Sequence, residues 1–261
     1  MSRIITLLTD FGHRDPFVGI MKGVILGITP DARIVDLCHE VHPQDISEAS
    51  YILARSVQYF PTGSVHVAVV DPGVGGPRRS LLVSTRNRLF VAPDNGLVGL
   101  AVSGEEYRAY HLDRPLYWLK PTSRTFHGRD VFAPVAAHLA RGVPPEELGT
   151  PIADFVRPAV EKPCRETASM RGKIQHIDRF GNLISNIPGN VLPELPGERF
   201  SAAICGQRIS ELKSCYAQAA PGELMMLIES FGYVEIACAG GRAQDVLNAQ
   251  KGEEITLEWN P

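Results

Sequence analysis

The sequence predicts an N-terminal α/β unit over residues 1–157, a linker over residues 158–169 and a smaller, barrel-like all-β unit over residues 170–261. In the first unit, short apolar runs alternate with helical patterns, which favours helices layered on a mainly parallel sheet. In the last unit, short runs alternate polar and apolar residues between turns, which favours antiparallel strands. The linker contains two prolines and mixed charges.

Strands are predicted where β-branched and aliphatic residues form runs of strand length. In the first unit these runs are residues 4–9, 33–38, 65–70, 80–84 and 89–92. In the last unit they are residues 173–177, 183–187, 223–229, 233–238 and 254–259, with one short helix at 243–249. The run at 65–70 is largely apolar, as expected for a strand that is covered on both faces.

Three helices of the first unit have start signals in the sequence. Asp15 is a good N-cap and the proline after it suits the first helical position, so one helix is predicted from there. Asp45 with Glu48 resembles a capping box and opens a second helix. A third helix is predicted over residues 131–141, with Asp130 as its candidate N-cap.

Composition and charge exclude several classes of protein. The 261 residues are 44% hydrophobic and 21% charged, which is ordinary globular usage and excludes a disordered chain, a collagen-like repeat and a coiled coil. The net charge of -3 does not favour nucleic acid or an anionic membrane as a partner. No apolar run approaches the ~20 residues that cross a bilayer, and no signal peptide is expected.

The five cysteines are odd in number and show no CxxC spacing. A disulfide framework or a Cys-rich zinc site is therefore not expected. Reduced thiols and a cytoplasmic location are the expectation.

Two acidic residues follow predicted strands of the first unit. Asp10 and Asp71 stand where ligands of open α/β sheets bind, beyond the carboxyl ends of the strands. Asp71 opens the glycine-rich segment 71–79, which is equally typical of a turn. Its glycines let the backbone approach a ligand closely. Neither a P-loop nor a GxGxxG fingerprint is present, so a nucleoside triphosphate or a dinucleotide is not indicated.

Histidines give a weaker signal. His127, just before the third helix, is a candidate functional residue, although a single His is more often structural. His39 and His42, near Asp36 and Glu40, hint at a metal site. Their spacing fits no zinc pattern, and a surface turn is the better interpretation.

Six motifs then occur in order along nearly the whole chain. They are Thr9-Asp10-Phe11-Gly12, Asp71-Pro72-Gly73-Val74-Gly75, Ala92-Pro93-Asp94-Asn95-Gly96-Leu97, Phe126-His127-Gly128-Arg129-Asp130, Ile177-Asp178-Arg179-Phe180-Gly181-Asn182 and Ser230-Phe231-Gly232. Together they resemble the S-adenosyl-L-methionine hydrolases, also called SAM hydroxide adenosyltransferases, which are relatives of the SAM-dependent fluorinase and chlorinase. The resemblance implies an α/β domain, a C-terminal β domain and a homotrimer with the ligand between neighbouring subunits.

The implied reaction is attack of water or hydroxide at the ribose C5′ of S-adenosylmethionine, which gives adenosine and L-methionine without a metal or cofactor. The sulfonium leaves as a neutral thioether, so the enzyme has only to orient and activate the nucleophile. The family's catalytic Asp, Arg and His fall on Asp71, Arg78 and His127, with Arg78 favoured over Arg79 by motif spacing. Asp71 and His127 would take the proton of water, and Arg78 would hold Asp71 ionised.

The resemblance also implies roles at the ribose and the methionine. Asp10 would accept both ribose hydroxyls. Asp15 and Asp178 correspond to acidic positions near the methionine amine, and Asp178 is the better candidate because Asp15 can simply cap a helix. Ser230 corresponds to the hydroxyl that binds the methionine carboxylate. Phe231 stands where the fluorinase has Arg, which leaves recognition of that end open.

Adenine recognition is implied for four further positions. Asn182 resembles the side chain that reads the adenine edge, because one amide supplies both a donor and an acceptor. Phe180 would pack near the base. The backbone at Ala239 and Gly240 corresponds to the adenine-contacting edge of the last strands.

Three other functions stay open. A halogenase-type substitution is disfavoured because a carboxylate at Asp71 repels halide, and because the fluorinase has an aromatic residue there and a Ser at the position of His127. A metal-dependent hydrolase would use Asp10, Asp71, Asp94 and His127, for which no tight ligand spacing exists. The third is a non-catalytic module that binds adenosine or SAM.

Overall fold

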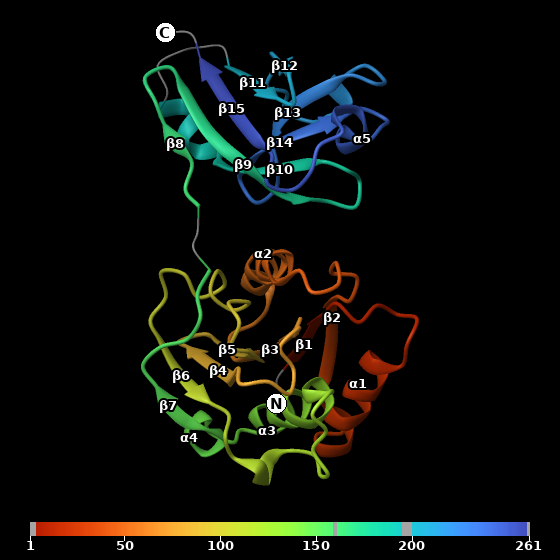
Figure 1. The fold of residues 1–261 in the computed structure, drawn as a ribbon, viewed down its shortest axis with the longest axis vertical. Coiled ribbons are helices and arrows are strands. Elements are labelled where there is room, and N and C mark those ends of the chain that lie inside the picture. Colours follow the sequence, from red (N-terminus) through yellow and green to blue (C-terminus); the bar gives the residue numbers. More distant parts are fainter. Residues whose placement is uncertain (1–3, 159–160, 195–199, 260–261) are drawn as a thin grey trace. The chain divides into compact units, whose positions relative to one another are not determined.

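The computed structural model describes residues 4–158, 161–194 and 200–259 (Figure 1). The chain divides into two compact units, residues 1–159 and residues 160–261. The predicted linker runs across this division, and its residues 159 and 160 lie outside the described residues. Its remainder contains a short strand, β8 (Cys164–Arg165), which pairs with β9 (Ser169–Ile177).

The first unit is built on one seven-stranded sheet in the order β2-β1-β3-β5-β4-β6-β7. Strands β2, β1, β3 and β5 are parallel neighbours, and β4, β6 and β7 follow through antiparallel pairs. All strands except β4 and β7 thus point the same way, which confirms a mainly parallel sheet. The bounds are β1 (Ile4–Thr9), β2 (Arg33–Cys38), β3 (Ser64–Val69), β4 (Ser80–Thr85), β5 (Arg88–Pro93), β6 (Tyr107–His111) and β7 (Thr150–Ile152). The five predicted strands are confirmed, whereas β6 and β7 are not among the predictions.

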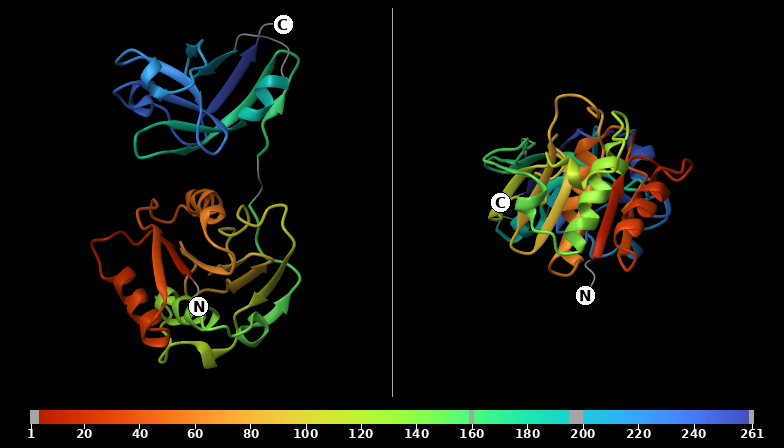
Figure 2. Two further views of the ribbon diagram at one scale, coloured as in Figure 1. Left: turned by 180° about the vertical axis from the view of Figure 1, so that it is seen from behind. Right: turned by 90° about the horizontal axis from the view of Figure 1, so that it is seen from below.

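Helices cover both faces of this sheet. Helices α1 (Phe17–Ile28) and α3 (Ala133–Ala140) lie side by side on one face, and α2 (Ile46–Ser56) packs on the other (Figure 2). Alternation along β3 makes this possible, because Val67 packs with α1 and α3 whereas Ala68 packs with α2. A short fourth helix, α4 (Pro145–Leu148), precedes β7.

The helix starts differ from the predictions in two places. Helix α1 has Pro16 at its N-cap with no capping side chain, so the predicted cap by Asp15 is wrong. A π-helical turn, Gly128–Phe132, precedes α3, so Asp130 is no N-cap either. The carboxylate of Asp130 is buried and accepts from the backbone N–H of Ser123 and from the neighbouring Arg129. Its burial beside that cation explains why the acidic residue lies inside the helical turn.

The cap of α2 is confirmed in one half only. The carboxylate of Asp45 accepts from the backbone N–H of Glu48 at 2.9 Å, as predicted. The side chain of Glu48 accepts from the backbone N–H and Nδ1 of His42 instead of reaching back to Asp45. The buried Glu48 side chain therefore fastens the loop before α2.

The second unit is an antiparallel, nearly closed barrel in the order β12-β11-β15-β9-β10-β14-β13. The two end strands, β12 and β13, contact each other. The bounds are β10 (Leu183–Pro188), β11 (Phe200–Ile204), β12 (Gln207–Ile209), β13 (Leu224–Ile228), β14 (Tyr233–Cys238) and β15 (Glu254–Trp259), with helix α5 (Ala243–Leu247) after β14. All the predicted strands are confirmed, and β11 and β12 are additional.

Two observations bear on the environment of the chain. None of the helices in the described ranges has the length and apolar character of a transmembrane segment. The five cysteines are all free thiols.

Candidate active site

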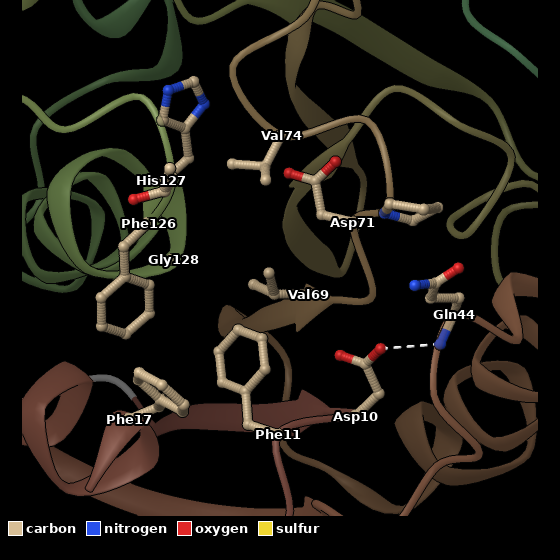
Figure 3. A pocket seen from close by; sticks show the side chains of 12 residues that line it. Asp10, Phe11, Phe17, Gln44, Val69, Asp71, Val74, Phe126, His127 and Gly128 are labelled. Atoms are coloured by element: carbon tan, nitrogen blue, oxygen red, sulfur yellow. Dashed lines mark hydrogen bonds between the residues drawn. The ribbon is translucent and has the colours of Figure 1, made fainter. Parts of the chain in front are cut away.

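A cavity of about 320 Å³ opens at the carboxyl ends of β1 and β3 (Figure 3). Asp10 follows β1, Asp71 comes shortly after β3, and His127 stands directly before the π-helical turn. The cavity is lined by Asp10, Phe11, Phe17, Gln44, Val69, Asp71, Pro72, Val74, Thr125, Phe126, His127 and Gly128. Three residues singled out in the sequence are thus brought into one site of the first unit.

Arg78 joins Asp71 to His127 from behind this lining. Its Nε donates to Asp71 Oδ1 at 3.0 Å, and its Nη2 donates to Asp71 Oδ2. The same Nη2 lies 2.8 Å from His127 Nδ1, and Nη1 donates to Ser80 Oγ at 3.0 Å. Only one of the guanidinium's N–H donors is left over from these contacts. Arg78 therefore holds Asp71 and His127 in a single network.

The contact with Arg78 determines the tautomer of His127. A guanidinium has no acceptor, so Nδ1 must carry the lone pair and the neutral imidazole keeps its proton on Nε2. Burial, followed by the positive charge of Arg78, lowers the pKa of His127 below its ordinary value, although the charges of Asp71 and Asp130 act in the opposite direction. His127 is therefore a neutral side chain with an N–H donor at neutral pH.

The ion pair beneath the cavity is largely withdrawn from water. The side chains of Asp71 and Arg78 are 6% and 11% exposed. The guanidinium carbon also lies 5.5 Å from the ring centroid of Phe132, within range of a cation–π contact. Removal of either partner would leave a buried charge without compensation.

Glycines allow the Asp71 loop to bring Arg78 back to the carboxylate. Two backbone hydrogen bonds close consecutive turns over residues 71–76. Gly75 has a φ of 74°, and a Cβ there would lie 2.1 Å from the carbonyl oxygen of Arg124. A Cβ on Gly73 would lie 3.3 Å from Arg78 Cγ. The segment is thus a turn, and this turn places Arg78 within hydrogen-bond distance of Asp71.

Asp10 is held by the loop that follows β2. Its Oδ2 accepts from the backbone N–H of Gln44 at 2.9 Å. The preceding Thr9 hydroxyl lies 2.8 Å from Nδ1 of the buried His39, whose Nε2 is 3.1 Å from Asp36 Oδ1. His39 therefore fastens the end of β1, which accounts for its position near Asp36.

An aromatic wall completes the cavity. Phe11, Phe17 and Phe126 meet edge to face, with ring centroids 5.3–5.8 Å apart. A Cβ on Gly128 would lie 3.1 Å from the Phe126 ring, so the glycine makes room for it. The cavity thus offers an aromatic side as well as the polar side formed by Asp10, Asp71 and His127. Three of the lining residues are not among the predicted site residues: Phe17, Gln44 and Phe126.

Other acidic candidates of the first unit lie outside this lining. Asp15 is exposed. Asp94 accepts from Arg79 Nε and from the backbone N–H of Val156, each at 2.7 Å, and so fastens the end of the first unit. Within the described ranges, no three His, Cys, Asp or Glu side chains are grouped closely enough to hold a metal ion.

In the second unit, Asp178 and Asn182 form the turn between β9 and β10. Asp178 Oδ1 accepts from the backbone N–H groups of Phe180 and Asn182, each at 2.9 Å. Its Oδ2 accepts from Asn182 Nδ2 at 3.0 Å. Asn182 is buried, whereas the Phe180 side chain is 73% exposed. Asp178 therefore shapes its own turn and presents the aromatic ring of Phe180 at the surface.

The remaining predicted residues lie at the ends of β13 and β14. Ser230 and Phe231 are exposed in the turn between these strands, where Glu229 accepts from the backbone N–H of Phe231 at 2.7 Å. Ala239 and Gly240 follow β14, and both the N–H and the carbonyl of Ala239 are used by backbone hydrogen bonds.

A buried carboxyl group in β14 is not among the residues that the sequence predicted for the site. Glu235 is 2% exposed and accepts from the hydroxyl of Tyr216 at 2.9 Å. Burial, followed by the charges of Asp178 and Glu229, raises the pKa of Glu235 to about 7, although the hydrogen bond from Tyr216 acts in the opposite direction. A Glu within the apolar run 233–238 was the available signal.

The fold and the site define a two-domain protein with a cation-bridged Asp and His at the edge of an α/β sheet. Models of the SAM hydroxide adenosyltransferase N-terminal and C-terminal domains match residues 5–149 and 172–256. The chain belongs to the SAM hydroxide adenosyltransferase family, which confirms the resemblance found from the six motifs.

Individual relatives agree with this membership. The chain is 37% identical over 258 residues to the (R)-S-adenosyl-L-methionine hydrolase of Salinispora arenicola, with 97% of each chain covered. It is 27% identical to a fluorinase of Nocardia brasiliensis, covering 90% of this chain and 89% of the fluorinase. An uncharacterized conserved protein from Thermotoga maritima has the same fold, with a TM-score of 0.91 and 33% identity over 97% of this chain and 99% of that one.

Proposed function

We propose that this protein hydrolyses S-adenosyl-L-methionine by attack of water at the ribose C5′ and releases adenosine and L-methionine. Family membership and the hydrolases among its relatives support this reaction. The observation that carries it is the network of Asp71, Arg78 and His127 at the wall of the cavity.

The network suits the activation of water. The carboxylate of Asp71 is paired with the cation of Arg78 and keeps lone pairs for a proton. His127 offers its Nε2–H to the lone pair of the same water. In this scheme His127 orients the oxygen and Asp71 takes the proton, a narrower assignment than the expectation that both residues accept it. Water has a pKa near 15.7, so the proton leaves as the C5′–O bond forms and the C5′–S electron pair returns to sulfur.

The same carboxylate disfavours the alternatives. A halide at the position of the attacking water would face the negative charge of Asp71, which favours a neutral nucleophile. The metal-dependent alternative is disfavoured because the charges of Asp71 and Asp94 are already balanced by the cations of Arg78 and Arg79. A non-catalytic binding module would need no such network beside its ligand.

Substrate recognition would be shared between the two units. Asp10 lies in the cavity and would bind the ribose hydroxyls. Asp178 and Ser230 would bind the methionine, with Asp15 a weaker candidate because it lies outside the cavity lining. Asn182 donates to Asp178, so its amide oxygen would accept from the adenine amino group, with Phe180 packed near the base. The resemblance assigns Phe231, Ala239 and Gly240 to the same ligand.

Isotope labelling tests the reaction. The protein is treated with a chelator and incubated with SAM in ¹⁸O water, and the products are analysed by mass spectrometry. We expect adenosine with one ¹⁸O at its 5′ oxygen and an equal amount of methionine. Intact SAM bound to the protein would favour the binding module, and activity restored only by added metal would overturn the proposed network.

The second part of the proposal is a homotrimer, which the resemblance supports. A cytoplasmic location is proposed as well, and the five free thiols support it. Co-expression of Asp71→Asn with Asn182→Ala tests whether neighbouring subunits share a site. If each site combines two neighbouring subunits, random mixing restores about a quarter of wild-type activity, because a site needs one intact unit from each neighbour. Sites within one subunit would stay inactive in every mixture.

A further inference from the structure

A strained residue stands at the edge of the cavity. The backbone N–H of Asp45 donates to the carbonyl of His42 at 3.0 Å and closes a turn with Pro43 and Gln44 in the middle. Gln44 has a φ of 68°. Proline followed by a residue with positive φ is typical of a type II turn, where glycine or asparagine is usual in the second position. Glutamine is an unfavourable choice for this backbone.

The turn itself does not need the glutamine side chain. The backbone N–H of Gln44 donates to Asp10 Oδ2, and its carbonyl accepts from Ile46. Every hydrogen bond that Gln44 makes with the described residues comes from its backbone. Glycine could supply all of them with less strain.

The side chain of Gln44 lines the cavity. Figure 3 places it between Asp10 and the loop that carries Asp71. Strain at a cavity edge, combined with a side chain that makes no hydrogen bond with the described residues, points to a role in ligand binding.

We propose that the side-chain amide of Gln44 binds a ribose hydroxyl of the substrate together with Asp10, and thereby selects ribonucleosides over deoxyribonucleosides. This inference rests on the proposed function. A hydroxyl both donates and accepts, whereas a carboxylate only accepts. Asp10 therefore leaves the oxygens of the sugar hydroxyls without a donor. The amide of Gln44 supplies that donor on the Asp10 side of the cavity.

Adenosine binding tests this role without requiring turnover. Gln44→Gly keeps the turn and removes the amide, and Gln44→Glu keeps the shape but removes the donor. We expect both variants to weaken adenosine binding ~3–10-fold in calorimetry, as expected for one neutral hydrogen bond. A nucleoside that lacks the hydroxyl bound by Gln44 should lose this difference. Either 2′-deoxyadenosine or 3′-deoxyadenosine should therefore bind to wild type and to Gln44→Gly with the same affinity. KM for SAM should rise by the same factor, with little change in kcat.

Cys205→Gly provides the matched control, because Cys205 is another left-handed residue, with a φ of 49°, in the turn between β11 and β12. It should leave adenosine binding unchanged. Equal adenosine affinity of wild type and Gln44→Gly, in a protein that still hydrolyses SAM, would overturn the role of Gln44 alone. A wild-type protein that neither binds adenosine nor cleaves SAM would remove the proposed function as well.

Discussion

Asp71 in the first unit and Asp178 in the second each open a glycine-containing turn, and the hydrogen bonds of their carboxylates differ in origin. Both oxygens of Asp71 accept from Arg78, a side chain that also holds His127. Both oxygens of Asp178 accept from residues of its own turn, within four positions along the chain. The charge of Asp71 is therefore balanced by a cation, whereas that of Asp178 stabilises local backbone geometry.

The surroundings extend this contrast. Asp71 belongs to a buried ion pair, while the charges of Asp178 and Glu229 help to raise the pKa of the buried Glu235. A carboxylate paired with a cation stays ionised and can accept a proton during a reaction. The first arrangement suits catalysis, and the second suits the recognition of a cationic ligand group.

The largest effect is expected for Arg78→Met. The variant leaves the buried Asp71 without its cation and removes the partner of His127 Nδ1, so we expect loss of turnover and destabilisation by about 3–5 kcal/mol. Urea unfolding and SAM turnover measure both effects. Arg78→Lys is the control, which should retain part of the stability because it keeps the charge without the fork. Unchanged unfolding of Arg78→Met would show that the pair is not a structural unit.

Exchange of carboxylate for amide at the two aspartates tests the contrast directly. Asp71→Asn removes the proton acceptor, so kcat should fall ~10²–10⁴-fold with a smaller change in KM. Asp178→Asn keeps an oxygen for the two backbone N–H groups, so the fold and kcat should persist while KM for SAM rises. Steady-state kinetics of the two variants side by side separates the roles. Equal losses of kcat in both would remove the distinction between them.

Acid should inhibit the reaction through His127. Its pKa is lowered by burial and by Arg78, so His127 is neutral above that pKa and protonated below it. Protonation adds a hydrogen to Nδ1 and breaks the contact with Arg78. Turnover should therefore fall as pH drops below the ordinary His range. His127→Gln, which keeps a donor near the Nε2 position, should be modestly slower and should lack that acid limb in a pH–rate profile. An unaltered acid limb in the variant would assign the titration to another group.

The strongest sequence signals in the first unit come from its buried strands. Strands such as β1 and β3 are long apolar runs covered on both faces, so their pattern is strong. Strand β6 carries the exposed Arg108, and β7 has only three residues, one of them Pro151. Strands that are short or partly exposed in this way depend on their neighbours in the sheet for definition.

The site shows the same limit. Asp71 and His127 stand out through motif spacing, and the structure brings Arg78 to Asp71 while Arg79 binds Asp94. Gln44 and Phe126 enter the cavity only because the loops after β2 and before α3 meet there. Such tertiary packing of two loops leaves no periodic pattern in the sequence. Asp15 and Asp130 show the converse, since good capping residues are overridden by their surroundings.

The smallest effect is expected in the acidic group of the second unit, through Glu235→Gln. The pKa of Glu235 is raised to about 7 from an ordinary value near 4.5, so the folded state binds its proton more tightly than the unfolded state. Stability from this group is fully present below pH 4.5 and is lost as pH rises through about 7. The glutamine variant should match wild type near pH 4.5 and be more stable, by about 1–3 kcal/mol, at pH 8. Urea unfolding at both pH values measures the difference. A variant less stable than wild type at pH 8 would mean that the ionised Glu235 is compensated, and the two acidic regions would then be alike.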